Sequence, residues 1–371
     1  MIRLSKSIVG QIEAEAVAKV ICEDGYLGMG SEVKLFEEEI ATFIGVPAEN
    51  ICCVNSGTAA LHLAVQAVTE PGDEVLVQSL TFVASFQAIS GAGAVPIPCE
   101  VLPESITLDI EDARKRLTEK TKAVMPVHYG SNPGNLDAIY EFAEKENLRV
   151  IEDAAHAFGC KYKGRNIGSF GDIICFSFDG IKNITSGEGG AIVTSDRNVM
   201  ALAKDARLLG VEKDTEMRFN GKRSWEFDVK HQGYRFHMSN IFAAVGRVQL
   251  GRFISEFAPK RVAIAEKYRE LLDGVKGLKL LESDLRFVVP HIMPVRILDG
   301  NRDGLKDYLE KKGIQTGIHY KPNHMLSLYG DRAYDLGTSE KLYSELLSLP
   351  LHPEVTEEHV VNICESIKSY F

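Results

Sequence analysis

From about residue 50, the chain alternates between short apolar runs and longer stretches in which apolar residues recur at helical spacing. The short runs are rich in valine and isoleucine, which favour strands; they are "NICCV", "DEVLVQS", "AVPIPCEV", "KAVMPVHYG", "LRVIEDAA", "DIICFSF" and "GGAIVTS". The stretches between them, such as "TFVASFQAISGAG" and "NLDAIYEFAEKENL", have the spacing of amphipathic helices. This alternation predicts an α/β domain in which helices cover a mainly parallel sheet.

The pattern changes after about residue 250. A long helical stretch, "ISEFAPKRVAIAEKYRELLDGV", is followed by the strand-like run "FVVPHIMPVRIL", a helix at "RDGLKDYLEKKG" and a C-terminal helix at "EEHVVNICESIKSY". We therefore expect a large domain over residues 1–250 and a smaller α+β domain over residues 251–371. Residues 1–15 are left open, since they either stay with the large domain or pack on the smaller one.

In a parallel sheet, ligands bind beyond the carboxyl ends of the strands. The residues that follow the predicted strands are therefore the first candidates for a site; they are Ser56, Phe82, His128, Asp153, Ser177 and Lys182. Lys182 is the hardest of them to explain, because it lies between two apolar strands in the loop "SFDGIKNITSGEGG". Taken alone, such a lysine is either a solvated loop charge or an amine held for Schiff-base chemistry with an aldehyde.

Three further features each have a structural and a chemical interpretation. Ser56 and Thr58 start a helix and form either a simple N-cap or a phosphate site made of hydroxyls and free N–H groups. Asp153 ends a strand and is either another N-cap or the partner of a protonated ring nitrogen. Phe82 is either a core residue or the cover of a flat ring.

Taken together, the chemical interpretations describe a single cofactor. A phosphate cradle, an aromatic cover, an acid for a pyridinium nitrogen and a Schiff-base lysine are the parts of a pyridoxal 5′-phosphate site. Ser177, at the end of the strand that leads to Lys182, adds a phosphate hydroxyl. The glycines of "GEGG" allow the backbone to approach the ligand closely.

Composition narrows the choice of partners. The 371 residues include 52 acidic and 42 basic ones, a formal net charge of −10, so the average surface repels nucleic acid and anionic membranes. No apolar run has the ~18 residues of a membrane helix, and Glu13 and Glu15 come too early for the apolar core of a signal peptide. The seven cysteines lack C-x-x-C spacing, and we interpret all seven as reduced core thiols of a cytoplasmic protein rather than metal ligands.

The sequence resembles the DegT/StrS family of aminotransferases, which act on sugars and have the aspartate aminotransferase fold (fold type I). The likeness runs through "GSEVKLFEEEIATFIG", "SGTAALHLA", "GDEVLVQSLTFVAS", "VIEDAAHAFG", "SFDGIKNITSGEGG", "GYRFHMSNIFAAVGRVQL" and "LSLPLHPEVTEE". The resemblance implies that Lys182 holds the cofactor as a Schiff base and that Asp153 pairs with the pyridine nitrogen. The family's phosphate-binding positions are matched by Ser56, Gly57, Thr58 and Ser177. Its positions that contact the cofactor ring are matched by Phe82 and His156.

One block departs from the common family pattern. Many relatives read G-Y-N-Y-R-M-S/T, and the asparagine reaches the phosphate in the site of the partner subunit. Here "GYRFHMSN" has Arg235 at the asparagine position and His237 at the arginine position. A guanidinium still binds phosphate through charge and two parallel donors, although a contact to the substrate is the alternative. The resemblance also implies a homodimer with shared sites.

The resemblance therefore implies amino transfer to a keto-sugar, and to a nucleotide-linked one, with L-glutamate as the amino donor. Two alternatives stay open: a sugar dehydratase that keeps the cofactor as pyridoxamine phosphate, and a non-catalytic regulator of the same fold. Dehydratases of the family carry histidine at the position of Lys182, which argues against the first. His319 and Tyr320 in "GIHYKPNH" are candidate substrate contacts, and His324 is either a contact or a polar residue on a surface loop.

Overall fold

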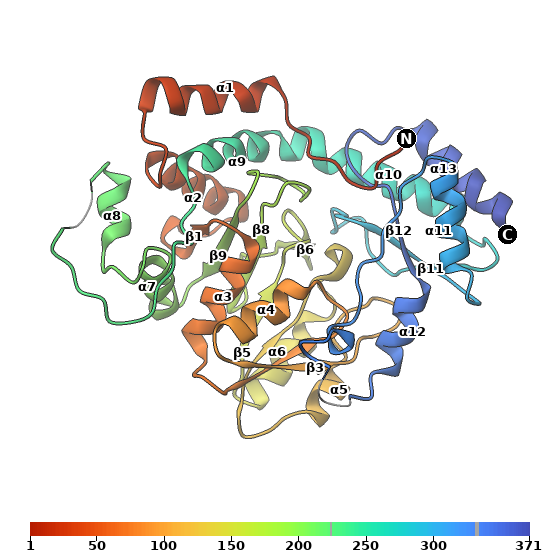
Figure 1. Ribbon diagram of the computed structural model, residues 1–371, viewed down its shortest axis with the longest axis horizontal. Coiled ribbons are helices and arrows are strands. Elements are labelled where there is room, and N and C mark those ends of the chain that lie inside the picture. The colour runs from red at the N-terminus through yellow and green to blue at the C-terminus, as the bar shows by residue number, and fades with distance from the viewer. Residues whose placement is uncertain (223–224, 331–333) are drawn as a thin grey trace.

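A computed structural model of the protein describes residues 1–222, 225–330 and 334–371. Its larger part is built on one seven-stranded sheet with helices on both faces (Figure 1). The strands lie in the order β1 (Ile51–Val54), β9 (Gly190–Thr194), β8 (Ile173–Ser177), β5 (Arg149–Asp153), β4 (Thr121–Met125), β2 (Glu74–Gln78) and β3 (Val95–Cys99). Outside this sheet, β6 (Lys161–Tyr162) and β7 (Arg165–Asn166) form a short hairpin.

The sheet is mainly parallel, as the alternation of strands and helices predicts. The pairs β2–β3, β2–β4, β4–β5 and β5–β8 are parallel, whereas β9 runs antiparallel to both of its neighbours, β8 and β1. The carboxyl ends of the other strands therefore share one edge of the sheet, and β9 begins at that edge. The sequence predicted β9 as a strand but carried no sign of its direction.

Helices cover the two faces of this sheet. One face packs against α2 (Ser31–Ile44), α5 (Ile110–Lys115), α6 (Leu136–Lys145) and α9 (Asn240–Arg252). The opposite face packs against α3 (Gly57–Val68), α4 (Val83–Gly91) and α7 (Arg197–Ala206). The short helix α8 (Asp214–Phe219) follows α7.

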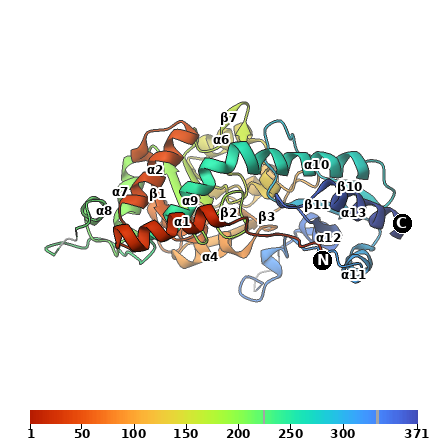
Figure 2. The same cartoon turned by 90° about the horizontal axis from the view of Figure 1, so that it is seen from above.

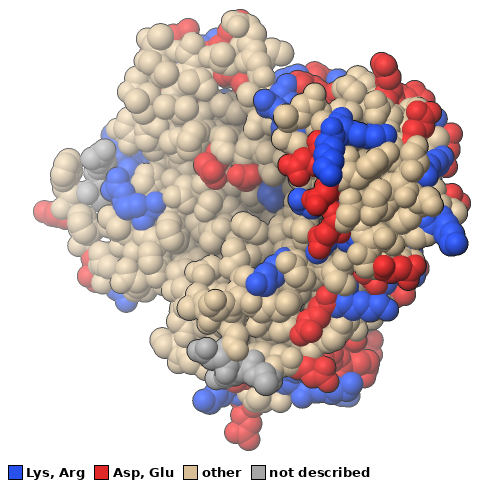
Figure 3. All heavy atoms as spheres, turned by 45° about the vertical axis from the view of Figure 1, so that its right-hand side comes forward, with Lys and Arg blue, Asp and Glu red and all other residues tan. Residues whose placement is uncertain are grey.

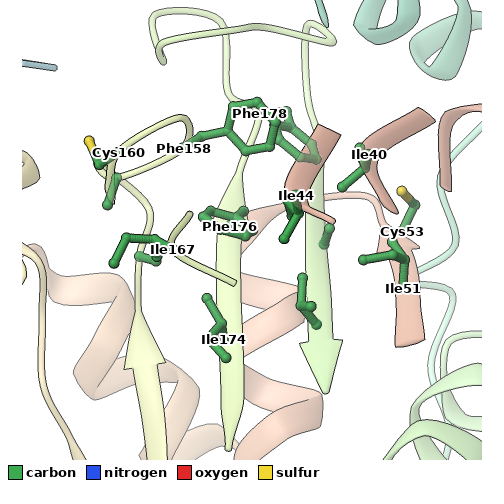
Figure 4. Close-up of a cluster of buried hydrophobic side chains, with 14 of the residues drawn as sticks. Ile40, Ile44, Ile51, Cys53, Phe158, Cys160, Ile167, Ile174, Phe176 and Phe178 are labelled. Carbon is green, nitrogen blue, oxygen red and sulfur yellow. The ribbon is translucent and has the colours of Figure 1, made fainter. Parts of the chain in front are cut away.

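Strand β1 explains why the buried strands read as unbroken apolar runs. Ile51 and Cys53 belong to one core cluster, and Cys52 and Val54 belong to the other. Figure 4 shows Ile51 and Cys53 on the side where Ile44 of α2 lies. Because side chains alternate between the two faces of a strand, a strand buried on both faces needs an apolar residue at every position.

A nearly continuous helical segment links the two predicted domains. Helix α9 passes through a π-helical turn, Phe253–Phe257, into α10 (Ala258–Leu272), and Figure 2 shows the two running along the molecule one after the other. The predicted boundary at residue 250 thus falls inside a helix. The division into two domains stays a prediction.

The C-terminal part has its own antiparallel sheet, β10 (Leu278–Leu280), β11 (Met293–Ile297) and β12 (Leu346–Leu349). Its core also includes residues of α10, α11 (Arg302–Lys311) and α13 (Glu357–Tyr370), while α12 (Gly337–Glu345) precedes β12.

The predicted strand "FVVPHIMPVRIL" is wrong in its first half, because β11 begins only at Met293. The preceding backbone is bound by side chains of the larger part. The Val289 N–H donates to Cys160 Sγ at 3.3 Å, and the His291 N–H donates to Ser131 Oγ at 2.9 Å. Pro290 between them has no N–H to offer to a sheet.

The N-terminal residues contact both parts of the chain. Ile2 forms a parallel bridge with Ile314, and the Leu351 N–H donates to the Leu4 carbonyl at 3.1 Å. Helix α1 (Gln11–Lys19) then packs along α9, above the larger sheet in Figure 1.

The surface carries charges of both signs. On the face shown in Figure 3, blue and red side chains are interspersed, and the central area is largely uncharged. Among the helices of the described residues, none is both long and apolar enough to cross a bilayer.

Candidate active site

A cavity of about 340 Å³ lies at the edge of the sheet where the parallel strands end. Its walls come from the segments that follow β1, β2, β4, β5 and β8, and from the C-terminal part. The structure brings nearly all the predicted site residues to it; those that line it are Ser56, Gly57, Thr58, Phe82, Asp153, His156, Ser177, Lys182, His319 and Tyr320.

The start of α3 forms one wall, at a point where three backbones meet closely. Ser56 caps the helix, since its Oγ accepts the Ala59 N–H at 3.1 Å. A Cβ on Gly57 would lie 2.7 Å from Ser177 Cβ, and a Cβ on Gly190 would lie 2.5 Å from the Ser56 carbonyl oxygen. Glycine at both positions lets β8 and β9 approach a helix start, whose first N–H groups have no intrahelical partner.

Asp153 at the end of β5 is a buried, oriented carboxylate. Its Oδ2 accepts a hydrogen bond of 2.7 Å from Ser85 Oγ on α4, and its Oδ1 accepts the Ala155 N–H at 3.2 Å. Ser85 Oγ also lies 3.1 Å from Thr81 Oγ1. The sequence analysis missed Ser85 and Thr81, although both belong to the segment "LTFVASF" that includes Phe82.

Lys182 lies in the loop between β8 and β9, where both its backbone N–H and its backbone carbonyl form hydrogen bonds. Its N–H donates to the Asp179 carbonyl at 3.0 Å, and its carbonyl accepts a bond of 3.5 Å from Arg261 Nη2. Burial lowers the pKa of the Lys182 amine from 10.5 to about 8; the charge of Arg261 also lowers it, whereas Asp153 and Asp179 oppose the shift. A lysine with this pKa has an appreciable neutral fraction near pH 7.

Two histidines and two tyrosines line the same cavity as the amine. Tyr320 OH lies 3.2 Å from His156 Nε2, and Tyr129 OH donates to the His319 carbonyl. Burial and the charge of Lys182 lower the pKa of His156 well below 6.5 and that of His319 to about 4. Burial raises the pKa of Tyr320. Both imidazoles are thus neutral at pH 7, and the phenol is protonated.

Other cavity residues had a weaker signal in the sequence. Tyr129 directly follows a predicted strand end, and Asp179 and Glu188 lie in the lysine loop, where they also line the cavity. Phe82 is 55% exposed, with its ring centroid 5.4 Å from that of Tyr320. An exposed apolar ring at the cavity, rather than in the core, favours the interpretation of Phe82 as a cover.

Two histidines singled out from the sequence lie elsewhere. His128 is fully buried with its Nε2 3.0 Å from Glu152 Oε2, so the expectation that it lies at the site is wrong, and its neighbour Tyr129 takes the place. His324 is also buried, with Nδ1 2.7 Å from Ser79 Oγ and Nε2 3.1 Å from Glu340 Oε1. It is neither a surface residue nor part of the cavity wall.

Arg235 lies on the outside of its own chain. Its backbone pairs with Leu208, and its carbonyl accepts a bond of 3.2 Å from Asn55 Nδ2, next to the start of α3. The side chain is exposed and lies apart from the cavity of the same chain. His237 pairs through its backbone with Val54, and burial lowers its pKa to about 4.

A mainly parallel seven-stranded sheet flanked by helices, with a buried lysine at its carboxyl edge, defines the pyridoxal-phosphate-dependent transferases of fold type I. A sequence model of the DegT/DnrJ/EryC1/StrS aminotransferase family matches residues 8–368, and the chain belongs to this family. It is an aminotransferase by that membership.

Similar proteins cover the chain almost completely. It is 33% identical to a dTDP-4-dehydro-2,3,6-trideoxy-D-glucose 4-aminotransferase of Saccharopolyspora spinosa, over 99% of this chain and 96% of the other. It is 33% identical to a GDP-perosamine synthase of Escherichia coli O157:H7, over 98% and 97%. The PLP form of a sugar aminotransferase described as Spr1654 of Streptococcus pneumoniae has a TM-score of 0.90 at 27% identity, over 99% and 98%.

Proposed function

We propose that the protein transfers an amino group from L-glutamate to a keto-sugar carried on a nucleotide, for example a 4-keto-6-deoxy or 3-keto hexose, with pyridoxal 5′-phosphate held by Lys182. The observation that carries this proposal is the single cavity that contains Lys182, Asp153 and the glycine-lined start of α3. Two relatives whose names specify nucleotide-linked sugars support the substrate class. Membership of an aminotransferase family supports the reaction.

The residues around the cavity fit the cofactor. A phosphate is suited to the start of α3, where free N–H groups, the helix dipole and the hydroxyls of Thr58 and Ser177 favour an anion. The close approach at Gly57 leaves no room for a side chain there. Asp153, fixed by Ser85, has lone pairs left for a protonated ring nitrogen. Phe82 and His156 are assigned to the ring.

Bound at these residues, pyridoxal phosphate supplies a reactive aldehyde carbon and a ring that accepts electrons. Lys182 would hold this carbon through its amine and, when that amine is free again, would carry the proton taken from the donor's Cα. Its lowered pKa of about 8 suits both roles, because the amine must be neutral to attack and must also carry a proton. The Asp153 carboxylate would keep the ring nitrogen protonated.

Other residues of the cavity wall are suited to a sugar. Asp179 and Glu188 offer carboxylate acceptors for hydroxyl groups, and His319 and Tyr320 offer further polar atoms beside the amine. Since His319 and Tyr320 come from the C-terminal part, the substrate would lie between the two parts of the chain.

A homodimer with shared sites is part of the proposal. Arg235 is exposed and does not line the cavity of its own chain, so the proposal assigns its phosphate contact to the cavity of a second subunit. Apolar side chains on the adjoining segment, Trp225, Phe227 and Val229, are also exposed, as expected of a surface that another subunit covers.

The test is a screen of the purified protein with ¹⁵N-labelled glutamate and pyridoxal phosphate against keto-sugars, both free and nucleotide-linked. The proposal predicts transfer of the label to a nucleotide-linked sugar and release of one 2-oxoglutarate per amino group. Loss of a sugar hydroxyl without amino transfer would indicate the dehydratase instead. Binding of a sugar without any conversion would indicate the regulator.

A further inference from the structure

Arg261 is an arginine whose charge is buried without an acidic partner. Its side chain is 2% exposed on α10, as deeply buried as the core residues around it. The other buried arginines of the described residues, Arg207, Arg296 and Arg302, each lie within 2.8 Å of a carboxylate oxygen. Within that same part of the chain, Arg261 has no such contact.

The Arg261 guanidinium binds main-chain carbonyls instead. Nη1 donates to the carbonyls of Pro290 and His291, at 3.4 and 3.3 Å, and Nη2 donates to the carbonyl of Lys182 at 3.5 Å. Its Nε is buried without a partner. An arginine of the C-terminal part thus holds the residue that carries the amine.

Burying the Arg261 charge in this way costs free energy of folding. If the residue served only to pack, an uncharged side chain would be sufficient. A buried charge without a counter-ion is destabilising, whereas a well-packed apolar residue of similar volume is not. Hydrogen bonds that anchor this loop do not need a charged donor. Asn183, the next residue, anchors it with a neutral amide, which donates to the carbonyls of Phe158 and Val289 at 3.2 and 3.0 Å. The positive charge of Arg261 therefore calls for another explanation.

We propose that Arg261 is a positioning residue that fixes the main chain of Lys182 and keeps a positive charge close to that residue, so that its amine readily loses its proton. The proposal rests on the proposed role of Lys182. The charged groups that face Lys182 are Asp153 from β5 and Asp179 from its own loop, which favour the ammonium form, and Arg261 from α10, which opposes it. The nearby imidazoles of His156, His291 and His319 are neutral at pH 7, because burial lowers the pKa of each.

Arg261 itself stays charged in the working range of the protein. Burial lowers the pKa of its guanidinium to about 10, which still leaves it protonated near pH 7. With Arg261 removed, burial alone would oppose the effect of Asp153 and Asp179 on Lys182, and the amine would hold its proton more tightly.

The test measures the proton affinity of Lys182 in the full-length protein without cofactor. The rate at which trinitrobenzenesulfonate modifies the Lys182 peptide, followed by mass spectrometry, is determined as a function of pH. Arg261→Gln and Arg261→Met remove the charge with different effects on packing, and Arg261→Lys keeps it. Asn183→Ala removes the uncharged hydrogen bonds that anchor the same loop. Thermal melting shows which variants are folded.

We expect the modification midpoint to rise by about half a pH unit or more in the two neutral variants, and to stay near the wild-type value in Arg261→Lys and Asn183→Ala. A midpoint that is unchanged in whichever neutral variant is folded would overturn the proposal. An equal rise in Asn183→Ala would do the same, because it would make the effect mechanical. This readout needs no bound cofactor, so it is independent of whether the proposed aminotransfer reaction occurs.

Discussion

Lys182 is an amine on which the surroundings act in opposite directions. Burial and Arg261 favour the neutral form, and the carboxylates of Asp153 and Asp179 favour the ammonium, with a net pKa of about 8. A group that serves as nucleophile and then as proton carrier works best with a pKa close to the working pH. The residues around Lys182 thus have a chemical consequence as well as a structural one.

The first prediction concerns the pH dependence of cofactor capture. The rate at which cofactor-free protein takes up pyridoxal phosphate should rise with pH, because only the neutral amine attacks, and should level off above a midpoint near pH 8. Stopped-flow visible absorbance measures this rate, with Lys182→Ala as background. A rate that keeps rising towards pH 10.5, the value of an ordinary lysine, would contradict the lowered pKa.

At the scale of elements, the site depends on how closely α3 approaches β8 and β9. Gly57 and Gly190 are the points of contact, and the nearest atoms are the Cβ of Ser177 and the main chain of Ser56. Backbone atoms cannot move aside as the end of a flexible side chain can. The phosphate site proposed here is therefore a product of packing between elements.

Gly57→Ala tests this packing. The added Cβ would lie 2.7 Å from Ser177 Cβ, so α3 and β8 must separate. We expect a loss of about 1–3 kcal/mol in the free energy of unfolding and weaker retention of pyridoxal phosphate, measured by thermal melting and by dialysis. Gly251→Ala in α9 is the control, since nothing lies within 4 Å of its added Cβ. Equal behaviour of the two variants would refute the close approach.

A buried ion pair between Arg207 and Glu37 joins elements near the start of α3. Arg207 Nη1 donates to Glu37 Oε1 at 2.7 Å and to the Cys53 carbonyl at 2.6 Å, which joins α2, β1 and the end of α7. Glu37→Ala leaves the Arg207 charge buried without a partner and should cost about 3–5 kcal/mol. Glu38→Ala, one residue along the same helix, removes only an exposed pair with Lys34 and should cost less than about 1 kcal/mol. Denaturant unfolding compares them, and similar losses would contradict the account.

The elements show what the sequence can predict. Runs such as "DIICFSF" became strands because both faces of the sheet are buried and every position is apolar. The run before Met293 has the same composition, yet Cys160, Ser131 and Arg261 take its backbone groups. Such long-range contacts leave no periodic signal in a sequence. The direction of β9 is hidden for the same reason.

Some residues of the candidate site could likewise be predicted from the sequence, and others could not. Ser56, Asp153, Ser177 and Lys182 were predictable, because each lies at or just beyond the end of a strand, at the edge of the sheet where ligands bind. Arg261 was not, since it lies on a helix more than seventy residues beyond Lys182 and has the spacing of any polar residue on a helical surface. Only the packing of α10 against the 290–291 segment reveals it.

At the scale of the whole molecule, the proposal implies a site that one chain alone does not complete. Arg235 faces outward, and the proposal assigns it to the phosphate in the partner subunit. Arg235→Ala should then weaken cofactor retention by about 1.5–3 kcal/mol, the value of a hydrogen bond to a charged group. Arg235→Asn should recover part of this loss. Equilibrium dialysis against pyridoxal phosphate measures both.

A subunit-mixing experiment distinguishes a site built from two subunits from a site built within one subunit. When Lys182→Ala chains exchange with Arg235→Ala chains, each mixed dimer has one site with both defects and one with neither, so activity should rise above that of either parent. Absence of recovery after proven exchange would assign Arg235 to its own chain or to no site. A raised KM for the sugar with normal cofactor retention would make Arg235 a substrate contact.

The central claim is that Lys182 holds pyridoxal phosphate for amino transfer to a nucleotide-linked keto-sugar. The most direct measurement is a single-turnover experiment on the loaded protein, in which the visible absorption of the lysine-bound cofactor is followed as glutamate and then the keto-sugar are added. The account predicts that glutamate abolishes this absorption with release of one 2-oxoglutarate per site, that the keto-sugar restores it with formation of one amino sugar, and that Lys182→Ala shows neither change. Full turnover by Lys182→Ala, or an absorption in the wild-type protein that glutamate leaves unchanged, would contradict it.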